Sequence, residues 1–166
     1  PFILGEIKEN ITTTNNSLNK FSKEEIMKQA LKFHSKGNFP KAQKLYEYLI
    51  KKGFNDSRLY SNYGVICQQS GKVDKAIELY RKSIALFPNS SGAYSNLGII
   101  LKKCGKLKEA KIILKKAVEV NPSNHNDYLN LGNILSSLGE LNEAEIATRK
   151  AIKIKPNFAM AHCNLG

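Results

Sequence analysis

Residues 91–124 read SGAYSNLGIILKKCGKLKEAKIILKKAVEVNPSN, and this stretch of 34 residues decides the fold. Apolar residues recur at spacings of three and four in each of its two halves. That spacing is typical of an α-helix with one buried face. The stretch therefore predicts two helices, at about 91–103 and 107–120, with Gly105 ending the first and Pro122 following the second.

The same pattern returns every 34 residues without a gap in register. Full units begin at Ser57, Ser91 and His125, a partial unit begins at Ala159, and a weaker unit begins at Lys23. A fixed period of about 20–50 residues is the signature of a solenoid, in which each repeat stacks on its neighbours. The recurring residues are Tyr60, Tyr94 and Tyr128; Gly64, Gly98 and Gly132; Gly71, Gly105 and Gly139; Ala76, Ala110 and Ala144; and Pro88, Pro122 and Pro156.

This pattern resembles the tetratricopeptide repeat (TPR), in which an aromatic residue, Leu-Gly and a large apolar residue precede alanine, a second large apolar residue and proline. One unit matches it at Tyr94, Leu97, Gly98, Leu101, Ala110, Leu114, Ala117 and Pro122. The resemblance covers residues 23–166. It implies an all-α, right-handed superhelical TPR solenoid of antiparallel helix pairs, with a concave surface lined by the first helix of each pair.

The domain organisation follows from the period. Residues 1–22 are predicted to be a flexible leader, because their Thr-, Asn- and Ser-rich part has no helical period. The predicted units of the array are 23–56, 57–90, 91–124, 125–158 and the partial unit 159–166. A stacked array needs a terminal unit with a polar outer face. No such unit is present in the sequence, which predicts that the chain is a fragment of a longer protein.

The sequence contains no pattern typical of catalysis or of cofactor binding. It has no phosphate-binding glycine loop and no nucleophile elbow. The histidines, which are His34, His125 and His162, fall in different units without a nearby carboxylate pattern. We therefore predict no catalytic residue, no metal and no cofactor, so that this segment is not itself an enzyme.

The three cysteines have neither metal-ligand spacing nor a Cys-x-x-Cys motif. Cys67, Cys104 and Cys163 are predicted to be buried or half-buried free thiols in a reducing compartment. No apolar run approaches 18 residues, so no membrane span is predicted. We also find no signal segment, and these features together favour a cytoplasmic location.

The net charge of +12 raises the question of an anionic partner. Basic pairs recur on the second helices at the same period, at Arg81-Lys82, Lys115-Lys116 and Arg149-Lys150. They form a solvated outer face, or they attract an acidic protein, nucleic acid or a membrane surface. Nucleic acid is disfavoured, because no aromatic stacking platform is interleaved with the basic residues. The oligomeric state is left open.

An asparagine recurs on the first helix of successive units, at Asn62, Asn96, Asn130 and Asn164, with Lys28 at that position in the first unit. An Asn side chain carries one carbonyl and one NH₂ group. It can therefore pair with the N–H and C=O of a peptide unit and ignore the side chain. The row predicts recognition of an extended peptide. The alternative is that these amides serve helix packing or hydrogen bonding between repeats.

The predicted groove lies on the face of the first helices that points away from the second helices. Its residues are Asn62, Asn96, Asn130, Asn164, Ser61, Ser95, Val65, Ile99, Asn133, Gln69 and Lys103. The asparagine row is similar to the one that lines the TPR superhelix of O-GlcNAc transferases. That resemblance implies a role in peptide binding for Asn62, Asn96, Asn130 and Asn164.

The leading functional hypothesis is a protein–protein interaction scaffold that binds an extended peptide segment. Two alternatives are the substrate-recognition region of a larger glycosyltransferase or sulfotransferase, and a basic solenoid that binds anions or nucleic acid. TPR co-chaperones clamp chaperone carboxylates with Lys, Asn, Asn, Lys and Arg. The corresponding positions hold Met27, Leu31, Asn62, Gly92 and Asn96, so the basic ligands of that clamp are absent.

Overall fold

The computed structural model describes Leu18 and residues 20–164, and all the elements within this part are α-helices. Their bounds are α3 Lys23–Ser35, α4 Phe39–Lys51, α5 Ser57–Gln69, α6 Val73–Leu86, α7 Ser91–Lys103, α8 Leu107–Val120, α9 His125–Ser137, α10 Leu141–Ile154 and α11 Ala159–Cys163. The bounds of α7 and α8 confirm the two helices predicted from the 34-residue stretch.

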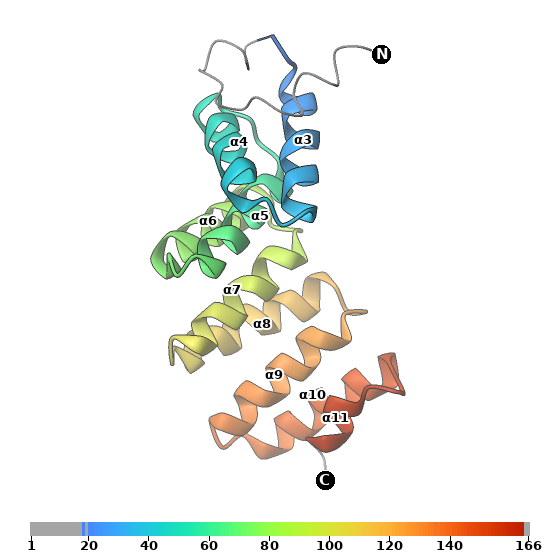
Figure 1. The fold of residues 1–166 in the computed structure, drawn as a ribbon. Helices are drawn as coiled ribbons and strands as arrows, with labels where there is room; N and C mark the ends of the chain where they lie inside the picture. The colour runs from blue at the N-terminus through green and yellow to red at the C-terminus, as the bar shows by residue number, and fades with distance from the viewer. Residues whose placement is uncertain (1–17, 19, 165–166) are drawn as a thin grey trace.

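Consecutive helices pack as antiparallel pairs, and the pairs stack into a solenoid (Figure 1). The pairs are α3 with α4, α5 with α6, α7 with α8, and α9 with α10. The first helices of successive pairs also touch directly, α5 with α7 and α7 with α9. Figure 1 shows α7 and α9 in front of α8 and α10. This arrangement confirms the predicted all-α solenoid.

Local sequence sets where the helices begin and end. Ser22 starts α3 with a capping box, in which its hydroxyl accepts from the Glu25 N–H and its own N–H donates to the Glu25 carboxylate. Gly105 follows α7 with a φ of 74°, a left-handed conformation that costs a side-chain-bearing residue about 1–2 kcal/mol. Residues within each unit therefore set where its helices begin and end.

In the units that begin at Ser57 and Ser91, a second glycine allows the two helices of a pair to approach closely. A Cβ added at Gly98 in α7 would lie 2.5 Å from Cγ of Leu114 in α8. Gly64 faces the ring of Tyr80 in the same way, one pair earlier. Leu114 and Tyr80 are fully buried. The glycine therefore makes room for a large core side chain on the second helix.

The predicted leader lies mostly outside the described residues, since residues 1–17 and 19 are not described. Of its remaining residues, Leu18 is only 8% exposed and belongs to the hydrophobic core. Phe21 packs against the same core, and Ser22 caps α3.

Candidate functional site

Asn96 and Asn130 hold equivalent positions on the adjacent helices α7 and α9. Both side chains are half-buried. Among the described residues, neither amide has a hydrogen-bond partner. A partly buried amide without a partner loses hydration without compensation, so these two groups are available to a ligand.

The other two asparagines of the row have partners within the chain. The Asn62 side chain interacts with Tyr46 of α4, whose hydroxyl also lies 3.3 Å from Nδ1 of His34 and whose pKa is raised to about 12 mainly by burial. The Asn164 amide donates to Oδ1 of Asn133 at 2.5 Å. Both contacts join successive helix pairs. Asn62 and Asn164 therefore fit the alternative role of the asparagine row, which is hydrogen bonding between repeats.

Two predicted groove serines use their hydroxyls inside the array. Ser61 does not face away from the second helix as expected, because its hydroxyl lies 3.1 Å from that of Ser83 in α6. Ser83 is fully buried and needs a polar partner, which explains the difference. Ser95 contacts α9, the first helix of the next pair, because its hydroxyl donates to Oδ2 of Asp127 at 2.8 Å.

The remaining groove residues differ in exposure. Val65 packs partly buried against the hydrophobic core, and Ile99 is half-buried. Gln69 and Lys103 are exposed near the ends of α5 and α7. Asn133 and Asn164 line a polar hollow of about 600 Å³. Arg149 of α10 also lines this hollow. It is not among the predicted groove residues, because the basic residues of the second helices were expected on the outer face.

Asp127 is a buried carboxyl that the sequence analysis did not single out. It is 1% exposed, at a repeat position that holds Ala93 and Ala161 in neighbouring units. Ser95 and Asn124 hydrogen bond to it at 2.8 and 2.7 Å, and both are uncharged. Burial raises the pKa of this carboxyl above its usual value. An aspartate at a repeat position that holds alanine in neighbouring units could have identified this residue from the sequence.

Asp127→Ala is expected to become more favourable relative to the wild type as the pH rises. The folded-state pKa of Asp127 lies above the unfolded value, so its contribution is most favourable at low pH and is lost as the carboxyl ionises. Urea unfolding of both proteins at about pH 4 and pH 7 measures the difference. A stability difference that is equal at the two pH values contradicts the raised pKa.

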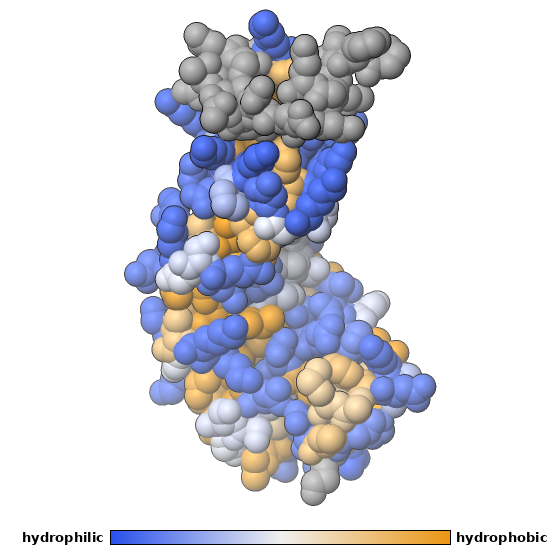
Figure 2. Space-filling view, in the orientation of Figure 1, coloured by the Kyte–Doolittle hydropathy of each residue, from blue (hydrophilic) through white to orange (hydrophobic). Residues whose placement is uncertain are grey.

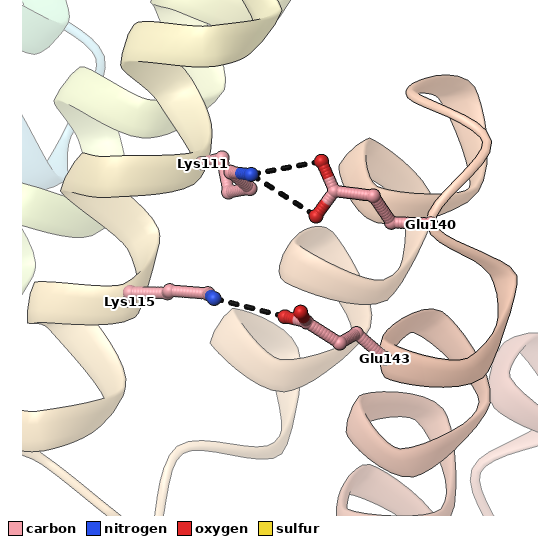
Figure 3. A network of polar contacts seen from close by, with 4 residues as sticks. All are labelled: Lys111, Lys115, Glu140 and Glu143. Atoms are coloured by element: carbon pink, nitrogen blue, oxygen red, sulfur yellow. Dashed lines mark hydrogen bonds and ion pairs between the residues drawn. The ribbon is translucent and has the colours of Figure 1, made fainter.

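The predicted basic stripe is largely engaged in ion pairs. Arg81 of α6 lies 2.6 Å from Glu109 of α8, and the equivalent Lys115 of α8 lies 2.8 Å from Glu143 of α10. Figure 3 shows the second of these pairs beside Lys111 and Glu140. Lys116 and Arg149 pair with carboxylates on their own helices. The pairs of Arg81 and Lys115 bridge successive second helices, and all four ion pairs of the stripe reduce the charge available to an anionic ligand.

Three further features bear on function: hydrophobic patches, metal-ligand clusters and membrane-spanning helices. Figure 2 shows hydrophilic residues over most of the front face, with a hydrophobic patch over α11. No group of three or more His, Cys, Asp or Glu residues in the described part is placed to hold a metal ion. No helix there is long and apolar enough to cross a membrane.

The expectation of covered thiols is correct only for Cys67, which is buried. Cys104 and Cys163 are exposed. Cys104 follows the last residue of α7 at the turn, and Cys163 is the last residue of α11. Neither position is covered by a neighbouring described helix.

Three tetratricopeptide repeat models match the sequence, at residues 28–91, 68–131 and 128–158. None of the curated proteins compared with the chain matches it significantly. Among solved structures, MamA is similar at 29% identity and a TM-score of 0.75, over 82% of this chain and 80% of MamA.

Two further solved structures are similar in fold. YrrB, described as a TPR protein with an unusual peptide-binding site, has 20% identity and a TM-score of 0.72, over 82% of this chain and 71% of YrrB. The first TPR of Spaghetti (RPAP3), bound to the HSP90 peptide SRMEEVD, has 24% identity and a TM-score of 0.64. It covers 66% of this chain, and the match includes 86% of that structure.

Proposed function

The chain belongs to the tetratricopeptide repeat family, and we propose that it is an interaction scaffold that binds an extended segment of a partner protein along α7 and α9. The observation that carries this proposal is the pair of half-buried amides of Asn96 and Asn130. They occupy equivalent positions on touching helices, and neither has a hydrogen-bond partner in the described chain.

The spacing of the two amides suits an extended ligand. Packed helices lie about 8–10 Å apart, and an extended chain covers about 3.3 Å per residue. Asn96 and Asn130 would therefore meet peptide groups about three residues apart. Each amide offers one donor group and one acceptor, the complement of a peptide unit. Such a site binds backbone and tolerates many side chains.

The comparisons support the proposal only at the level of the fold. YrrB and RPAP3 are TPR structures associated with peptides, but their identities to this chain are 20% and 24%. The argument for a peptide here therefore rests on the chain's own amides. Of the predicted groove residues, the proposal relies on Asn96 and Asn130, because Asn62, Asn164, Ser61 and Ser95 have partners within the protein.

The proposed role of this segment is binding and not catalysis. No contact among the described residues favours the alternative of a recognition region in a larger glycosyltransferase or sulfotransferase. The anion-binding alternative is weakened by the ion pairs of Arg81 and Lys115. Both alternatives stay predictions from the sequence.

The double variant Asn96→Ala/Asn130→Ala tests the proposal. Peptides selected on the wild-type protein from a phage-displayed library of random 12-residue sequences serve as probes. We expect the double variant to bind them about tenfold or more weakly, since each neutral hydrogen bond contributes about 0.5–1.5 kcal/mol. N-methylation of single peptide nitrogens should weaken binding similarly. Isothermal titration calorimetry measures both effects.

The matched control is Asn126→Ala/Asn142→Ala, which removes two exposed amides from α9 and α10. It should bind like the wild type, and both double variants should keep the wild-type melting temperature. Full peptide affinity in Asn96→Ala/Asn130→Ala, together with early unfolding, assigns these amides to stability and contradicts the proposal.

A further inference from the structure

A second candidate surface lies between the second helices α8 and α10, on another face of α9 than Asn130. It is a hollow of about 340 Å³. Leu131 and Leu135 of α9 and Ala147 of α10 form its apolar part. A hollow of this size accommodates one large aliphatic or aromatic side chain.

One side chain that lines the hollow is smaller than its repeat equivalent on α8. Ala147 stands at the repeat position that Ile113 occupies on α8, one helix pair earlier. Ile113 packs against the hydrophobic core. Alanine has three carbon atoms fewer than isoleucine, so it leaves more room above Leu131 and Leu135, whose side chains are held in the core.

One wall of the hollow is formed by an exposed apolar side chain. Ile146 is 69% exposed on α10, and it lines the hollow together with the half-buried Tyr128. Ile112 has the same repeat position on α8 and is 65% exposed, but it does not line this hollow. The two isoleucines therefore provide a matched pair for experiment.

The rim of the hollow carries an available positive charge. Lys115 is paired with Glu143 across the opening from α8 to α10. Lys150 also lines the hollow, is exposed, and has no ion-pair partner among the described residues. A carboxylate next to a bound apolar group would find Lys150 free, in a chain whose net charge is +12.

The same arrangement occurs two helix pairs earlier. A hollow of about 340 Å³ between α4 and α6 is lined by Tyr60, Leu79 and Lys82, among other residues. These residues are the repeat equivalents of Tyr128, Ala147 and Lys150. The Lys82 ammonium lies over the Tyr60 ring, 5.3 Å from its centre. A tyrosine and a lysine beside an apolar hollow are thus a repeated feature.

We propose that the hollow between α8 and α10 binds a partner protein segment that inserts one large aliphatic or aromatic side chain and places an acidic residue against Lys150. The equivalent hollow at Lys82 is a second, weaker site for the same kind of segment, because there the lysine already interacts with Tyr60. This surface is independent of Asn96 and Asn130.

The test uses a capped peptide, acetyl-Asp-Asp-Phe-Asp-Asp-amide, and protein labelled at its isoleucine and alanine methyl groups. Titration should shift the Ile146 and Ala147 methyl signals in NMR spectra, with Ile112 changing less. Replacing Phe by Ser in the peptide should abolish the shifts. Replacing the aspartates by asparagines should weaken binding at least threefold, and so should raising the salt concentration.

Ala147→Ile is the main variant, because it adds three carbon atoms beside Leu131 and Leu135 and so narrows the hollow. It should lose peptide binding at least tenfold while keeping its melting temperature. Ile146→Ser should weaken binding at least threefold. Ile112→Ser, its matched control, should bind like the wild type.

Three results overturn the proposal. One is unchanged peptide affinity in both Ala147→Ile and Ile146→Ser. Another is equal binding of the Ser-containing peptide, which would mean charge attraction alone. The last is a shift of the Ile146 methyl with vesicles of phosphatidylcholine and phosphatidylglycerol but not with the peptide, which would assign the surface to membranes.

Discussion

Leu114→Ala is expected to lower the free energy of unfolding by about 2–5 kcal/mol, as for other fully buried leucines. Leu114 is 0% exposed, and it packs onto the backbone of Gly98 between α7 and α8. This pair lies in the middle of the array, so its loss also weakens the contacts of α7 and α8 with the helix pairs on either side. Urea unfolding followed by circular dichroism measures the change.

The same contact predicts a reversal of sign for a second substitution. Gly98→Ala alone should destabilise, because its Cβ would lie 2.5 Å from Leu114 Cγ, and overpacking costs about 1–3 kcal/mol. Part of this cost is offset by the higher helix propensity of alanine, about 0.5–1 kcal/mol. In the Leu114→Ala background the clash is gone, so Gly98→Ala should stabilise.

The four proteins of this cycle isolate the contact from other effects. Direct neighbours show coupling energies of about 0.5–3 kcal/mol, whereas distant sites add. Gly92→Ala is the matched control, because it is an exposed glycine on the same helix with nothing within 4 Å of an added Cβ. If Gly98→Ala has the same effect in both backgrounds, the close approach of the two helices is not what the glycine provides.

Tyr80→Ala is expected to cost about 3–5 kcal/mol, in the range of other buried aromatic truncations. Tyr80 is 0% exposed and is the equivalent of Leu114 one helix pair earlier. Its ring carbons lie 2.5–3.0 Å from the position of a Cβ on Gly64. The alanine variant would leave a cavity under α5 that the surrounding helices cannot fill.

Two milder variants divide this effect into its parts. Tyr80→Phe removes only the hydrogen bond to Gln68, 3.1 Å long, and should cost about 0.5–1.5 kcal/mol. Tyr80→Leu installs the residue of the next pair and should fall between Phe and Ala. Melting temperatures should follow this order, and an alanine variant as stable as the leucine variant contradicts the cavity argument.

The sequence predicted the fold in detail because local and global signals coincide in every unit. The apolar spacing places α7 and α8, and Gly105 with a φ of 74° ends the first of them. The candidate site was predicted less well. A hydrogen bond between units depends on which side chain the neighbouring unit presents, and a single repeat pattern does not contain that information.

Particular residues illustrate this limit. Asn62 and Asn96 have similar sequence contexts, yet Asn62 interacts with Tyr46 and Asn96 has no partner among the described residues. The position equivalent to Tyr46 for Asn96 holds Tyr80, whose hydroxyl donates to Gln68 instead. Tyr46 is itself in contact with His34, the repeat equivalent of Gln68, so the repeat pattern alone does not show which tyrosine also reaches the amide.

The sequence by itself determined the helix pairs, their period and the family, because helix periodicity and backbone conformation are local properties. The packing of the helices establishes which asparagines have partners among the described residues, that Arg81 and Lys115 are paired, and that a hollow lies beside Ala147. The two ion pairs depend on side chains 28 residues apart in the sequence, and the other outcomes depend on how adjacent helices pack. The row of four equivalent amides in the sequence thus becomes two available amides in the structure.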